Sequence, residues 1–83
     1  MPNYADILNA VYEVLRNFTK EGQELREETE LVADLNLDSV KVMELLLNIE
    51  DSFDISIPLN ILPDVRTVKD LSLQIQKITE ESQ

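Results

Sequence analysis

The chain of 83 residues contains no cysteine, no histidine and no tryptophan, and it has a single glycine. Without cysteine it can form no disulfide, and it has no thiolate to act as a nucleophile or a metal ligand. Without histidine it lacks the usual general base at neutral pH and the commonest zinc ligand. The side chains left for catalysis are Asp, Glu, Lys, Tyr, Ser and Thr, which is a thin set for an enzyme.

Positive charge is also scarce, because 7 basic residues stand against 17 acidic ones and give a formal net charge of -10. This balance argues against nucleic acid or an anionic membrane as partner, since phosphate groups are bound by clustered Lys and Arg. It favours partner proteins with basic surfaces. The hydrophobic share of 43% is too high for a disordered acidic tail.

Long hydrophobic runs are absent as well, and no stretch approaches the length of a membrane span. Residues 1–4 do not show the basic start and apolar core of a signal peptide. From the length we expect one domain over residues 1–83. We expect it to be cytoplasmic, without stable insertion into a membrane.

Apolar residues at helical spacing predict a first helix over residues 3–18, with Asn3 as its N-cap. The apolar stripe comprises Ile7, Leu8, Val11, Tyr12, Leu15 and Phe18. Residues 19–37 then form a connection that is long for a compact domain, and such connections often carry function. We expect it to cross the other helices, pinned by Leu31 and Leu35.

The strongest helical pattern covers residues 39–53, after Asp38 as a suitable N-cap. Its inward stripe comprises Val42, Leu45, Leu46, Ile49 and Phe53. A second apolar set, Val40, Met43 and Leu47, lies off this stripe. A helix apolar over so much of its girth is either deeply buried or presents a surface to a partner.

The C-terminal part predicts one short helical turn between Pro58 and Pro63. A last helix is expected over residues 68–79, opened by Thr67 and Asp70 as a capping box. The chain therefore has the pattern of an all-α protein.

Asp34, Asn36 and Asp38 have the spacing that opens a calcium loop of the EF-hand kind. The rest of that motif is missing, because Ser39 stands where glycine is needed and Leu45 stands where the bidentate glutamate is needed. We expect no metal site.

Ser39 is the residue at which chemistry is most plausible, since it stands between the connection and the second helix. A hydrolytic role is excluded by the lack of histidine and of a Gly-x-Ser-x-Gly motif. Two interpretations remain open from physical chemistry. Ser39 either simply opens a helix capped by Asp38, or it carries a group such as a phosphate ester, which the positive helix end tolerates well.

The order of motifs around Ser39 resembles the acyl carrier protein family. The resemblance begins with Leu-Asn-Leu-Asp-Ser-Val over residues 35–40. It continues with Glu44-Leu45 and with Ile-Glu-Asp-Ser-Phe-Asp-Ile-Ser-Ile-Pro over residues 49–58. Thr-Val-Lys-Asp-Leu over residues 67–71 resembles the start of the family's last helix. The likeness extends over residues 4–79.

The resemblance implies an all-α four-helix bundle with a long first loop and a short third helix. It implies that Ser39, beside Asp38, carries 4'-phosphopantetheine, transferred from coenzyme A by a phosphopantetheinyl transferase. The terminal thiol of this arm would hold acyl groups as thioesters, which would explain the missing cysteine. The protein would be a carrier, not an enzyme, and a monomer that serves fatty acid, polyketide or related specialised lipid synthesis.

The resemblance also implies two groups of contact residues. Acyl-loading ligases, synthases and acyltransferases with basic surfaces would contact Val40, Lys41, Glu44, Leu47, Glu50 and Asp51. An acyl chain would be held among Leu45, Leu46, Ile49, Ile57, Ile61, Val65 and Leu71.

Four residues depart from the family pattern, and one of them is Ser52, which dilutes the acidic run before Phe53. Asn36 stands where glycine is usual, Val40 replaces leucine, and Lys41 replaces an acid beside the attachment site. These departures favour a specialised carrier over one for general fatty acid synthesis.

Two alternatives are kept. One is a peptidyl or aminoacyl carrier protein with the same fold and arm. The other, of a different class, is an unmodified acidic helical module that only binds other proteins.

Overall fold

The computed structural model describes residues 3–19 and 22–81, without the side chains of Leu59 and Leu62. Within these ranges the chain forms α1 (Tyr4–Leu15), α2 (Ser39–Phe53), the 3-10 helix η1 (Leu59–Asp64) and α3 (Val68–Glu81). The all-α four-helix arrangement predicted from the sequence is therefore confirmed, and the short third helix is of the 3-10 type.

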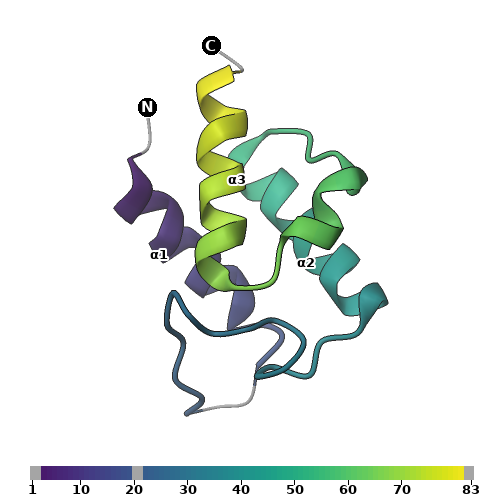
Figure 1. Ribbon diagram of the computed structural model, residues 1–83. Helices are drawn as coiled ribbons and strands as arrows, with labels where there is room; N and C mark the ends of the chain where they lie inside the picture. Colours follow the sequence, from purple (N-terminus) through teal and green to yellow (C-terminus); the bar gives the residue numbers. More distant parts are fainter. Residues whose placement is uncertain (1–2, 20–21, 82–83) are drawn as a thin grey trace.

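Helix α1 packs against both α2 and α3. Figure 1 shows that the start of α1 and the end of α3 lie at one end of the molecule, while the long connection after α1 folds across the other end. Among the described residues, no helix combines the length and the apolar character that a membrane crossing requires.

The predicted bounds of the first helix are wrong at its C-terminal end. Asn3 caps the helix as predicted, with its side chain accepting the Asp6 N–H at 2.9 Å. The helix stops at Leu15 because the Asn17 and Phe18 N–H groups bond to carbonyls three residues back, which tightens the last turn. Phe18 therefore packs on the core from a turn instead of from the helix.

The core collects side chains from α1, α2, α3 and the connection, and Ile61 of η1 packs against it. Its most deeply buried members are Ile7, Val11, Leu15, Leu31, Leu45, Ile49, Val68, Leu71 and Ile75. Each such aliphatic side chain stabilises the fold by about 1.5–3 kcal/mol through its removal from water.

The connection between α1 and α2 is held in place by its backbone as well as by apolar anchors. Leu31 and Leu35 are buried, as predicted. The Leu31 N–H donates to the Arg66 carbonyl, and the Val68 N–H donates to the Thr29 carbonyl. These bonds join the connection to the start of α3, so a loop without regular structure becomes a fixed part of the fold.

Helix α2 has the predicted bounds, and α3 continues two residues beyond the predicted end at residue 79. The predicted capping box is present, since Asp70 N–H donates to Thr67 Oγ1 at 3.1 Å and Thr67 N–H donates to Asp70 Oδ2 at 3.2 Å. Such a box satisfies two N–H groups that the helix itself leaves unpaired.

Candidate functional site

The approach to Ser39 is a tight turn built from the end of the connection. Asp34 Oδ2 accepts the Glu30 N–H at 2.8 Å, and the Leu37 N–H donates to the Leu31 carbonyl. Asn36 adopts a left-handed conformation with φ 58°, which asparagine tolerates better than most residues. This backbone turn replaces the glycine turn expected from the family pattern.

Ser39 is the first residue of α2 and its side chain is exposed. The capping role belongs to Asp38, whose Oδ1 accepts the Lys41 N–H at 2.9 Å. In the part of the chain that the structure describes, no hydrogen bond engages the Ser39 hydroxyl. The hydroxyl is therefore accessible at the positive end of a helix, where a phosphate ester is electrostatically favoured.

The exposed face of α2 mixes apolar and charged side chains. Val40 is 62% exposed and Leu47 is 60% exposed, which is high for apolar residues of a small bundle. Glu44 and Asp51 are exposed too. Lys41 Nζ lies 3.7 Å from Glu44 Oε2, an ion pair that is worth at most about 1 kcal/mol at the surface.

Glu50 differs from the other residues predicted to contact partners. Its Oε2 accepts the Ile57 N–H at 2.7 Å, so this carboxylate fastens the segment after α2 to the helix. Glu50 is only partly exposed as a result. The sequence pattern grouped it with the acidic surface and gave no sign of this bond.

The residues predicted to hold an acyl chain do not form one open cavity. Leu45, Ile49 and Leu71 are fully buried in the core, and Val65 is also buried. Ile61 is half-buried against the core.

Leu46 and Ile57 are the two of that set that line a surface pocket. Met43, Leu47 and Glu50 complete its walls, and its volume is about 230 Å³. We refer to it as the α2 pocket. Met43 was not among the predicted pocket residues, although its place off the inward stripe of α2 indicated an exposed side chain.

The described residues contain no group of three or more acidic, histidine or cysteine side chains placed to hold a metal ion. The carboxylates of Asp34 and Asp38 are turned to backbone N–H groups instead. The arrangement around Ser39 thus offers a hydroxyl for attachment and a mixed surface for recognition.

Comparison with known proteins agrees with this arrangement. Residues 6–75 match the family described as "Phosphopantetheine attachment site". The chain is 44% identical over 55 residues to a "Probable acyl carrier protein" of Caulobacter vibrioides, a match that covers 66% of this chain and 64% of that relative, just under two thirds of its length. It is 33% identical over 78 residues to the "Meromycolate extension acyl carrier protein" of Mycobacterium leprae, covering 93% of this chain and 68% of that protein.

The fold has a solved counterpart as well. A structure from Mycobacterium tuberculosis, described as "a putative acyl carrier protein", superposes with a TM-score of 0.77 at 26% identity and covers 84% of this chain and 95% of that chain. Proteins of this family bear covalently attached 4'-phosphopantetheine and act as carriers, not as catalysts. Since the family match extends over most of its length, this chain belongs to the phosphopantetheine-attachment family, among the acyl carrier proteins.

Proposed function

We propose that Ser39 is the residue esterified with 4'-phosphopantetheine, and that the chain carries acyl intermediates as thioesters on this arm. The observation that carries the proposal is the exposed Ser39 hydroxyl at the first turn of α2, next to an aspartate that caps the helix by itself. A phosphate bonded to this oxygen would meet the unpaired N–H groups and the positive dipole of the helix end.

The loading step balances with coenzyme A as the donor. The Ser39 oxygen forms a bond to the phosphorus that bears pantetheine, the pyrophosphate P–O bond of coenzyme A breaks, and adenosine 3',5'-bisphosphate leaves. The serine proton passes to a base of the transferase or to solvent. The arm brings a thiol to a protein that has no cysteine.

Recognition by partner enzymes is proposed to use the exposed face of α2. Val40 and Leu47 supply apolar contacts, and Glu44 and Asp51 supply negative charge for basic partner surfaces. Lys41 is a positive charge on the same helix, which supports partners different from those of general fatty acid synthesis. Such contacts at the rim of an interface favour fast association and ready release.

The cargo is proposed to be an acyl group of fatty acid, polyketide or specialised lipid synthesis. The α2 pocket supports this, because its apolar walls suit a hydrocarbon chain and it opens beside the helix that begins with Ser39. A longer chain would have to separate Leu46 and Ile57 from the core. A peptidyl or aminoacyl carrier is the alternative, and loading assays with the corresponding ligases separate the two.

The single domain over residues 1–83, the monomeric state and the cytoplasmic location remain predictions. Size-exclusion chromatography with light scattering checks the monomer. Cell fractionation checks the location.

The attachment at Ser39 is tested by incubation with coenzyme A and a broad-specificity phosphopantetheinyl transferase, followed by intact-protein mass spectrometry. The wild type is expected to gain the mass of one phosphopantetheine, and Ser39→Ala is expected to gain nothing. Ser52→Ala, which changes another exposed serine of α2, is the matched control and should be modified like the wild type. If the wild type stays unmodified with several transferases, the carrier function is wrong and the unmodified interaction module is favoured.

A further inference from the structure

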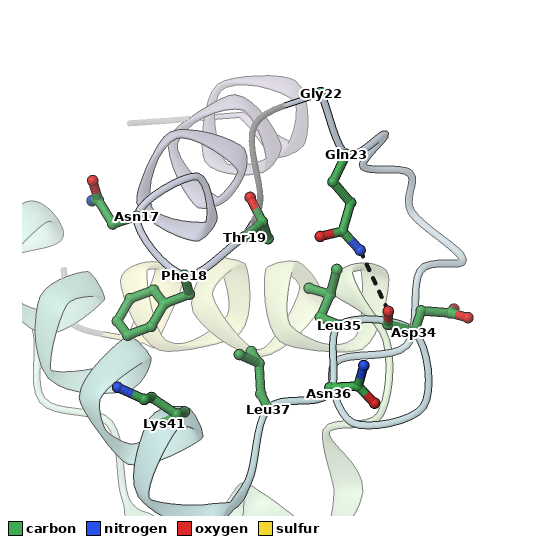
Figure 2. A pocket seen from close by; sticks show the side chains of 10 residues that line it. All are labelled: Asn17, Phe18, Thr19, Gly22, Gln23, Asp34, Leu35, Asn36, Leu37 and Lys41. Atoms are coloured by element: carbon green, nitrogen blue, oxygen red, sulfur yellow. Dashed lines mark hydrogen bonds between the residues drawn. The ribbon is translucent and has the colours of Figure 1, made fainter.

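A second and larger hollow lies on the other side of the start of α2, between the end of α1 and the long connection. Its volume is about 710 Å³, within the range of small-molecule sites. The residues used below are Asn17, Phe18, Thr19, Asn36, Leu37 and Lys41, and we call this hollow the loop groove. Figure 2 shows their side chains arranged around one opening, drawn from three different segments of the chain.

The chemistry of the loop groove differs from that of the α2 pocket. Phe18 and Leu37 give it an apolar floor, and the polar residues Asn17, Thr19 and Asn36 belong to its lining, although Figure 2 shows the Asn17 amide turned outward. Their amide and hydroxyl groups both donate and accept hydrogen bonds. A pure hydrocarbon chain would leave them without partners, whereas a ligand with amides and methyl groups would match both parts of the surface.

Among the described residues that line the loop groove only Asp34 and Lys41 are charged, although the protein is strongly acidic. Asp34 lines one edge, but its Oδ2 accepts the Glu30 N–H, and Figure 2 shows its carboxylate pointing away from the opening. Lys41 lines the opposite edge, where its half-exposed ammonium lies 3.7 Å from the Glu44 carboxylate. The described lining therefore offers neutral donors and one ammonium that is shared with Glu44, in a protein with a formal net charge of -10.

The loop groove is close to the attachment residue along the chain. Leu37 and Lys41 each stand two residues from Ser39, so their Cα atoms lie at most about 7.6 Å from the Cα atom of Ser39. Lys41 projects about 200° around the helix from Ser39, so it is the distal part of a tethered arm, not its phosphate, that faces the groove. Tethering makes docking intramolecular, so even a weak site is populated.

We propose that, in the modified protein without acyl cargo, the loop groove holds the pantetheine part of the arm, with its amides at Lys41 and the polar rim and its geminal methyl groups on Phe18 and Leu37. This proposal rests on the proposed attachment at Ser39. Docking there leaves the apolar α2 pocket to hydrocarbon cargo and shelters the terminal thiol when no acyl group protects it. The unloaded arm then binds in the loop groove and the acyl chain binds in the α2 pocket, on two sides of α2.

Isotope-filtered NMR on the modified protein tests the docking site directly. With labelled protein and an unlabelled arm, nuclear Overhauser contacts are expected between the geminal methyl groups and the side chains of Phe18 and Leu37. Contacts to Met43, Leu47 and Ile57 instead would place the arm in the α2 pocket and overturn the proposal. Arm resonances as sharp as those of free pantetheine, without any contact to protein, would also overturn it.

Substitution at the rim gives a second readout. Lys41→Met removes the ammonium donor and keeps a good helix former, so the equilibrium constant for docking should fall by about twofold to tenfold, as expected for one lost hydrogen bond. The alkylation rate of the thiol should then rise toward that of free pantetheine. Lys77→Met, at an exposed position of α3, is the matched control and should change neither quantity. Equal contacts and equal thiol rates in wild type and Lys41→Met would contradict the role given to Lys41.

Failure of this proposal is distinguishable from failure of the proposed function. Absence of the mass gain at Ser39 removes the carrier function itself. A normal mass gain combined with a freely mobile arm removes only the docking of pantetheine in the loop groove.

Discussion

At the scale of single residues, the presentation of Ser39 depends on two neighbours with separate roles. Asp38 caps α2 through the Lys41 N–H, and Asn36 turns the backbone through a left-handed conformation. Because the capping bond comes from Asp38, the Ser39 oxygen is available for an ester. Asp38 thus has a structural role as the cap of α2, independent of any contact with a partner enzyme.

The left-handed conformation of Asn36 can be tested by substitution. Asn36→Ala should lower the free energy of unfolding by about 1 kcal/mol, because alanine has no local hydrogen bond to offset the clash of its Cβ. Asn36→Gly should leave it unchanged or raise it slightly, since glycine adopts this conformation without a clash. Urea denaturation measures both.

Asn60→Ala is the matched control for this pair, because Asn60 is exposed in η1 and has no left-handed backbone. It should stay within about 0.5 kcal/mol of the wild type. An Asn36→Ala protein as stable as the wild type would show that the turn relaxes out of the left-handed region in solution.

At the scale of elements, α2 has apolar side chains on two faces, one buried in the core and one exposed to solvent. Its inward face supplies Leu45 and Ile49 to the core, and its outward face leaves Val40 and Leu47 in solvent. The sequence showed both apolar sets and left open whether the second is buried or exposed, and the structure shows that it is exposed. Periodicity could indicate the two sets because they lie on different sides of a helix whose register is fixed by its N-cap.

Helix α3 contains a polar group that its neighbours do not satisfy. Ser72 is fully buried, and within the described chain its hydroxyl has no hydrogen-bond partner. A buried hydroxyl without a partner costs free energy, and alanine is a better helix former than serine. Ser72→Ala should therefore raise the free energy of unfolding by up to about 1 kcal/mol in urea denaturation.

Ser56→Ala, at an exposed position outside the helices, provides the comparison and should have an effect within about 0.5 kcal/mol. Destabilisation by Ser72→Ala would mean that the hydroxyl bonds to a buried water or to a helix carbonyl in solution.

At the scale of the whole molecule, the long connection joins α1 to the start of α3 as well as to α2. Tyr4 on α1 donates its hydroxyl hydrogen bond to the Glu27 carboxylate on the connection. Burial, this hydrogen bond and the negative charge of Glu27 raise the pKa of Tyr4 to about 12. Burial and the same acidic stretch also raise the pKa of Tyr12.

This contact predicts a loss of stability in alkali. The pKa of Tyr4 is higher in the folded protein than its ordinary value of 10.0, so the contribution of its protonated form is complete below pH 10 and is lost as the pH rises toward 12. The free energy of unfolding should fall in this interval, and the fall should be smaller in Tyr4→Phe.

Absorbance spectroscopy can follow the ionisation of tyrosine in this protein, because the chain has only two tyrosines and no tryptophan that would absorb in the same region. Phenolate absorbance of the folded wild type should titrate later than that of the urea-unfolded chain. Parallel stability curves for wild type and Tyr4→Phe between pH 10 and 12 would contradict the role of Tyr4.

The sequence by itself determined the helices and their N-caps, because these depend on local rules, whereas Ser39 as the attachment residue stays a prediction. Spacing of apolar residues set α2, while Asn3, Asp38 and Thr67 marked helix starts through bonds that span only three residues. The predicted C-terminal end of α1 was wrong, because a last turn of the 3-10 type has no clear signal in the sequence.

Only the tertiary structure decided which surfaces surround Ser39. The Tyr4 bond to Glu27 and the loop groove join residues far apart in the sequence, and the Glu50 bond to Ile57 depends on how the segment after α2 folds back on the helix. The predicted acyl-chain residues were likewise divided between a closed core and the small α2 pocket. The physical reason is that burial and cavity shape depend on how helices pack against one another, whereas periodicity reports only which side of a helix is apolar.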